Sequence, residues 1–73
     1  MDKYRERFVD LAEKRVNRAI NYIRLIGNLS NTSNYKYSQD DVNKIIRALT
    51  AAVKDTEGRF KRNGDVENDY FKL

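Results

Sequence analysis

The chain contains no cysteine, no histidine and no proline, and only three of its 73 residues are glycine. Without cysteine it cannot form a disulfide, and without histidine a zinc site would need carboxylate ligands alone, which is rare. Histidine and cysteine also supply most general acid–base groups and nucleophiles in enzymes. We therefore expect no catalytic residues, no metal site and no cofactor, and we expect a protein that is not an enzyme and has no small-molecule substrate.

Long apolar runs are absent as well. No segment approaches the roughly 18 consecutive apolar residues of a membrane-spanning helix. The first ten residues, MDKYRERFVD, lack the apolar core of a secretory signal. The absence of cysteine fits a reducing compartment. Together these features predict a cytoplasmic protein that does not associate with membranes.

What the first third of the chain does have is helical periodicity. Its apolar residues recur at spacings of three and four: Phe8, Ala12, Val16, Ala19, Ile23 and Ile26. Such spacing places side chains on one face of a helix. With no proline to interrupt the pattern, a helix is predicted at residues about 3–26. Gly27 is expected to end it in the left-handed conformation that glycine adopts without steric strain.

A second helix is predicted at residues about 39–62. Ser38 and Asp41 have the spacing of a capping box, in which each side chain accepts from the other residue's backbone N–H. Tyr37 and Val42 have the spacing of a hydrophobic staple across the same cap. The apolar seam then continues at spacings of three and four through Val42, Ile46, Leu49, Val53, Thr56 and Phe60.

Two helices of similar length predict an all-α, antiparallel helical hairpin over residues 1–64. The connection, residues 27–38, is rich in Asn and Ser, whose side chains form hydrogen-bonded turns with the backbone. Residues 65–73 form an acidic and aromatic C-terminal tail. A domain this small has a marginal core of about 3–5 kcal/mol. Since disulfides and metals are excluded, oligomerisation is the remaining means of stabilisation.

The first helix is apolar around more of its circumference than one neighbouring helix can cover. Beside the stripe through Phe8 and Ile23, further apolar residues lie on both flanks: Tyr4, Leu11, Tyr22, Leu25 and Leu29 on one, Val9 and Ile20 on the other. A helix that packs on one neighbour needs an apolar arc of only about 100°. The excess predicts a homodimer in which two hairpins form a four-helix bundle. A groove on another protein or the C-terminal tail could cover this surface instead.

A basic stripe is the first candidate functional feature. The predicted outer face of the second helix carries Lys44, Arg47, Lys54, Lys61 and Arg62, in a chain of formal charge +4. Lys and Arg on one helix face can neutralise phosphates and release counterions, which gives salt-sensitive binding to nucleic acid. The alternative is a solvated face whose basic residues are favoured near the C-terminal end by the helix dipole.

Arg18, Tyr22, Tyr35 and Lys36 are candidates for contact with a partner. Arg18 falls within the second apolar stripe of the first helix, so it either extends its charge to solvent or stacks with Tyr22 in an interface. In the connection, Lys36 stands between two tyrosines, and aromatic residues beside basic ones suit base stacking or a protein interface. Structural roles in the turn are the alternative for both residues.

These features favour a small, non-catalytic regulatory binding protein that occupies a surface of a larger macromolecule, either nucleic acid or a nucleoprotein complex. The first alternative is an inhibitor or adaptor that binds a larger protein directly, of the size that phages and plasmids often encode. A purely structural assembly module is the second.

Overall fold

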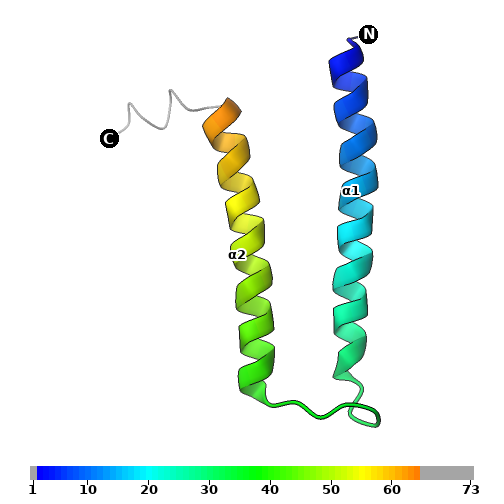
Figure 1. Ribbon diagram of the computed structural model, residues 1–73, viewed down its shortest axis with the longest axis vertical. Coiled ribbons are helices and arrows are strands. Elements are labelled where there is room, and N and C mark those ends of the chain that lie inside the picture. The colour runs from blue at the N-terminus through cyan, green and yellow to red at the C-terminus, as the bar shows by residue number, and fades with distance from the viewer. Residues whose placement is uncertain (1, 65–73) are drawn as a thin grey trace, which may run out of the picture. The chain divides into compact units, whose positions relative to one another are not determined.

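The computed structural model describes residues 2–64, and this part of the chain is all-helical, with no strand. Figure 1 shows its two long helices, α1 (Lys3–Gly27) and α2 (Gln39–Gly64). A single 3₁₀ turn, η1 (Asn28–Ser30), follows α1. The chain divides into two units, residues 1–36 and residues 37–73. The all-α prediction is confirmed, and each predicted helix boundary lies within two residues of the observed one.

The first helix begins at a cap that was not predicted from the sequence. Asp2 has extended backbone angles (φ −67°, ψ 125°), and its Oδ1 accepts a hydrogen bond of 2.8 Å from the Tyr4 N–H. The Glu6 N–H donates to the Asp2 carbonyl oxygen at 3.1 Å and so closes the first turn. The Asp2 side chain satisfies an otherwise unpaired N–H and places negative charge at the positive end of the helix dipole.

The end of α1 corrects the expectation for Gly27. This residue keeps right-handed helical angles (φ −59°, ψ −30°), and no residue of the described part has the left-handed conformation. The chain tightens into η1 instead of leaving the helix, and the Asn28 N–H donates to the carbonyl oxygens of Arg24 and Leu25. Because a 3₁₀ turn satisfies the last helical carbonyls by itself, no left-handed residue is needed.

Asn31 is where helical winding stops. Its backbone is extended (φ −68°, ψ 102°), and its Oδ1 accepts a hydrogen bond of 3.0 Å from the Ser33 N–H. Its carbonyl oxygen accepts from the Asn34 N–H at 3.1 Å and from the Tyr35 N–H at 3.0 Å. The prediction that asparagine side chains of this connection make turns with the backbone is confirmed at Asn31.

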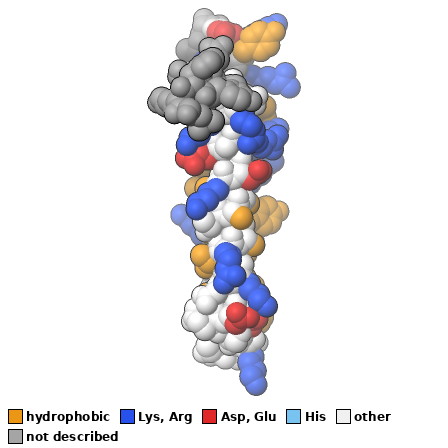
Figure 2. Space-filling model, turned by 90° about the vertical axis from the view of Figure 1, so that its left-hand side faces the viewer, with side chains coloured by type: hydrophobic (Ala, Val, Ile, Leu, Met, Phe, Trp, Pro, Cys, Tyr) orange, Lys and Arg blue, Asp and Glu red, His pale blue; other side chains and the backbone are white. Residues whose placement is uncertain are grey.

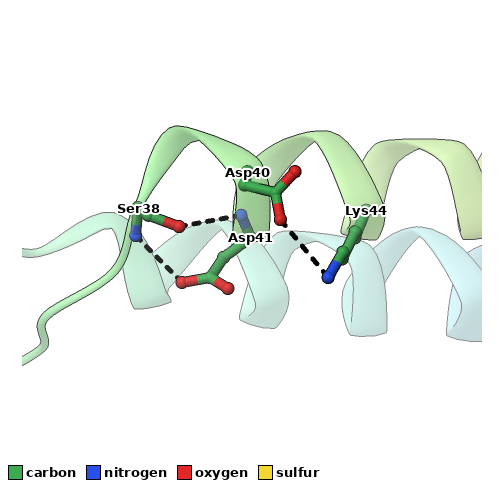
Figure 3. Close-up of polar contacts among 4 residues, drawn as sticks. All are labelled: Ser38, Asp40, Asp41 and Lys44. Atoms are coloured by element: carbon green, nitrogen blue, oxygen red, sulfur yellow. Dashed lines mark hydrogen bonds and ion pairs between the residues drawn. The ribbon is translucent and has the colours of Figure 1, made fainter.

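The capping box at the start of α2 is also confirmed. In Figure 3, the Asp41 N–H donates to Ser38 Oγ at 3.1 Å, and the Ser38 N–H donates to Asp41 Oδ2 at 2.9 Å. The Val42 N–H donates to the Ser38 carbonyl oxygen at 3.3 Å, the first backbone bond of the helix. Two otherwise unpaired N–H groups are thus satisfied reciprocally. The staple between Tyr37 and Val42 stays a prediction.

The apolar face of each helix remains largely exposed. No side chain within residues 2–63 is fully buried. In α2, Val42 and Leu49 are half-buried, whereas Val53 of the same seam is 63% exposed. Apolar area of this kind is favourably removed from water, so these faces are available for packing against another surface. The predicted C-terminal tail lies outside the described residues.

Candidate functional site

The five basic residues predicted to bind nucleic acid, which we call the α2 basic stripe, lie together on one helix: Lys44, Arg47, Lys54, Lys61 and Arg62. Figure 2 shows Lys and Arg side chains at intervals along the face in view, with fewer acidic side chains among them. Arg47, Lys54 and Lys61 follow one another every seven residues. Each step therefore spans about two turns, or roughly 10 Å along the helix.

Lys44 is the member of the stripe that has a carboxylate partner. Its Nζ lies 3.3 Å from Asp40 Oδ2, and both side chains are about two-thirds exposed (Figure 3). Exposed pairs one turn apart contribute about 0.3–0.5 kcal/mol. A phosphate group can therefore compete with Asp40 for Lys44. As long as the ion pair is formed, Asp40 neutralises part of the Lys44 charge.

The other four basic residues of the stripe are exposed and have no ion pair with a carboxylate in residues 2–64. Arg62 has a different environment from the rest. A Cβ built on Gly58 would lie 3.3 Å from an Nη nitrogen of Arg62, so the guanidinium group lies over the glycine one turn back. Gly58 accordingly leaves room for the Arg62 side chain against the helix backbone.

An acidic residue near the stripe was not considered in the sequence prediction. Glu57 stands three residues after Lys54 and four before Lys61, where helical side chains are neighbours. No ion pair joins Glu57 to either lysine in the described part of the chain. Its charge still lowers the positive potential of the C-terminal half of the stripe. Counting charges at spacings of three and four would have revealed this.

Arg18 and Tyr22 lie on α1, one turn apart. Both are exposed, and the Tyr22 side chain is 67% exposed. Stacking between these two residues, one of the two interpretations of Arg18, is not observed in residues 2–64. The cation–ring contacts described there join Lys3 to Tyr4 at 6.0 Å and Arg5 to Phe8 at 5.7 Å. Arg18 is exposed, and its role in an interface stays a prediction.

Tyr35 and Lys36 lie in the connection after η1, in the same unit as α1. The backbone N–H of Tyr35 is held by the Asn31 carbonyl oxygen, while its side chain is 50% exposed. Lys36 is exposed as well. The Asn31 turn thus fixes the backbone of Tyr35, while about half of the Tyr35 side chain stays accessible.

The larger basic excess belongs to α1, although only Arg18 was singled out there from the sequence. This helix contains seven Lys and Arg residues against three acidic ones, whereas α2 contains six against four. The net charges are therefore +4 for α1 and +2 for α2. The imbalance is visible in the sequence once charge is summed helix by helix.

Within residues 2–64, no three potential metal-ligating side chains come together, and no helix has the length and apolar character needed to cross a bilayer. The chain matches no known protein-family model, no curated protein and no solved structure. The surfaces of α1 and α2 are therefore the features from which a function can be proposed.

Proposed function

We propose that this chain is a small, non-catalytic regulatory protein of the cytoplasm that binds nucleic acid or a nucleoprotein complex through the α2 basic stripe. The observation that carries the proposal is the set of four exposed cations without a carboxylate partner in the described residues: Arg47, Lys54, Lys61 and Arg62. Unpaired cations along one helix face suit a polyanion whose charges recur along its length.

The proposal includes an architecture in which α1 and α2 close into an antiparallel hairpin and two copies form a four-helix bundle. Its support is the apolar surface that neither helix covers by itself, such as Val53 of α2 at 63% exposure and Val16 of α1 at 55% exposure. Within the α2 seam, the Thr56 hydroxyl donates to the Ala52 carbonyl oxygen at 2.9 Å. This bond satisfies the one polar group of the seam inside the helix and makes it compatible with burial.

A two-fold bundle would present the α2 basic stripe twice. Each copy supplies four cations that have no ion pair within residues 2–64, so binding to duplex nucleic acid should weaken with salt at a slope of about −3 to −4 for one stripe. A second stripe that contacts the same molecule would steepen this slope. Such binding needs no reading of base edges, and it therefore has little sequence preference.

The test is a salt titration of binding to a mixed pool of nucleic acids. Reversal of two charges, Lys54→Glu with Lys61→Glu, is expected to remove nearly all affinity and to flatten the salt dependence. A matched control, Arg5→Glu with Arg24→Glu, makes the same change in net charge outside α2 and should retain most of the affinity. Absence of binding by the parent protein at low salt would refute the proposal.

Direct binding to a larger protein, as an inhibitor or adaptor, is the second candidate function. It is favoured by the exposure of Tyr22 and Tyr35, since exposed tyrosine and arginine are enriched at interaction hot spots. In this case capture of the partner would survive Lys54→Glu with Lys61→Glu but fail with Arg18→Ala or Tyr35→Ala. If the parent protein neither binds nucleic acid nor captures a protein partner, a structural assembly module is favoured.

A further inference from the structure

One side of α1 combines aromatic and cationic side chains in a pattern that α2 lacks. We call it the Tyr–Arg stripe, and its members recur at spacings of seven, four, three and four: Tyr4, Leu11, Arg15, Arg18 and Tyr22. This spacing keeps them on one side of the helix. Tyr4 and Tyr22 stand five turns apart, which separates them by about 27 Å.

The two tyrosines at the ends of the stripe have the most exposed large apolar side chains of the described part, at 75% for Tyr4 and 67% for Tyr22. The Tyr4 ring has the Lys3 ammonium 6.0 Å from its centroid, which is the outer limit of a cation–ring contact. Tyr22 has no such contact in residues 2–64. Large, flat and accessible rings are stacking surfaces for other flat groups.

The two arginines between the tyrosines lack an acidic neighbour. No acidic residue stands three or four positions from Arg15 or Arg18 on either side. Lys14, one turn before Arg18, is itself engaged by Asp10 at 3.1 Å. Like charges at these spacings repel and destabilise a helix. An anion bound between Arg15 and Arg18 would relieve this repulsion.

The opposite flank of α1 has a different composition. Val9, Val16 and Ile20 form an aliphatic strip roughly 150° around the helix from the Tyr–Arg stripe, and the acidic residues Glu6 and Glu13 border it. Aliphatic side chains without polar atoms suit a dry protein interface. If this strip forms the contact between two copies, the Tyr–Arg stripe stays outside the bundle and accessible.

We propose that the Tyr–Arg stripe binds single-stranded nucleic acid, with phosphates on Arg15 and Arg18 and unpaired bases stacked on Tyr22 and Tyr4. The inference rests on the proposed function, because it takes nucleic acid as the partner and adds which form is preferred. Cations alone attract any phosphate backbone. Accessible aromatic rings beside them add stability only when the bases are free to stack on them. The α2 basic stripe has cations without aromatics and gives no such preference.

The experiment measures binding of fluorescent oligonucleotides of about 12 nucleotides, a length within the range of single-strand sites. The probes are single-stranded DNA, single-stranded RNA and a duplex of the same sequence. Tyr22→Leu is expected to weaken single-strand binding at least about fivefold and to leave duplex binding unchanged, whereas Tyr22→Phe should retain affinity because the ring remains. Because the chain has five tyrosines and no tryptophan, the part of the tyrosine quenching by the single strand that is lost in Tyr22→Leu reports stacking on that ring.

The second part of the experiment compares variants of two exposed arginines of α1. Arg18→Gln should weaken binding of the single strand and reduce its salt slope by about one, while Arg24→Gln, on the other side of the helix, should leave the affinity at the parent value. Helical circular dichroism and light scattering verify that each variant keeps its structure and oligomeric state.

The outcomes separate this inference from the proposed function. Equal binding of duplex and single strand, unchanged by Tyr22→Leu, would overturn the inference and leave the α2 basic stripe intact as the binding surface. A different result would support the inference and place the binding site on α1 instead of α2. In that result, single-strand binding is lost in Tyr22→Leu but retained in the double variant Lys54→Glu with Lys61→Glu. No binding of any probe by the parent protein would overturn both.

Discussion

The two helices are nearly equal in length, 25 residues in α1 and 26 in α2, yet they present different surfaces. The apolar residues of α2 form a seam that one neighbour can cover, and its outer face is basic without aromatics. In α1 the apolar residues extend around more than half of the circumference, and tyrosines and arginines share one flank. Similar amphipathic character therefore does not imply a similar role, because the width and composition of each face decide how many surfaces a helix can contact.

The largest expected effect comes from placing a charge on the aliphatic strip of α1. If Ile20 packs between two copies, Ile20→Glu buries an unpaired carboxylate, which costs several kcal/mol. The dimer should then dissociate at concentrations where the parent protein stays paired, as measured by light scattering or sedimentation. Asn17→Glu adds the same charge three residues earlier, on the polar side, and should leave the dimer intact. Equal behaviour of the two variants would mean that the strip faces solvent.

The caps of the two helices provide the next comparison. Ser38 and Asp41 satisfy two N–H groups reciprocally, whereas Asp2 satisfies one. Ser38→Ala should lower the free energy of unfolding by about 1–2 kcal/mol, and Asp2→Ala by about 0.5 kcal/mol. Urea unfolding at one fixed protein concentration measures both. The double variant Ser38→Ala with Asp41→Ala should lose less than the sum of the single losses, because the two residues form one unit. Additive losses would argue against the reciprocal box.

Substitution of two glycines tests the corrected end of α1. Gly27 has right-handed angles and open space around its Cβ position, so Gly27→Ala should raise the free energy of unfolding by up to about 1 kcal/mol. A left-handed Gly27 would make the same change destabilising. Gly58→Ala should also stabilise, but by less, because the Arg62 guanidinium must move a few tenths of an ångström. Thermal unfolding of the two variants gives the comparison.

The smallest effect concerns the partner of Lys44. Asp40→Asn removes the 3.3 Å ion pair and should lower stability by only about 0.5 kcal/mol, since exposed pairs of this kind contribute little. The same change frees Lys44 and should steepen the salt dependence of duplex binding by about one unit of slope. Asp55→Asn removes a carboxylate that has no ion pair in the described residues and serves as the control. Equal slopes in both variants would mean that Lys44 does not contact the ligand.

The sequence predicts well those features that depend on neighbours in the chain. Apolar spacing predicts the helices within two residues of the observed boundaries, and the Ser38–Asp41 spacing predicts both bonds of the capping box. The turn at Asn31 follows from asparagine's short amide side chain. In each case the interacting groups are at most four residues apart, so one local conformation determines the contact.

The sequence predicts less well those features in which two conformations of similar energy compete. A glycine after a helix can leave in the left-handed conformation or continue into a 3₁₀ turn, and the choice at Gly27 depends on the bonds available to Asn28. The partner of an exposed lysine is decided by differences of a few tenths of a kcal/mol. Spacing alone therefore does not distinguish Lys44, which pairs with Asp40, from Lys61, which has no ion pair with Glu57.

The interruption between the two helices has a consequence for how the protein could rearrange. Since η1 keeps the right-handed winding of α1, the stop at Asn31 depends on hydrogen bonds and not on the geometry of a glycine. Hydrogen bonds of this type compete with continued helix, and a helix-promoting solvent or Asn31→Ala shifts that competition. Winding would then extend beyond η1 toward Ser38, and the capping box of Ser38 and Asp41 would become the remaining barrier between the two helices.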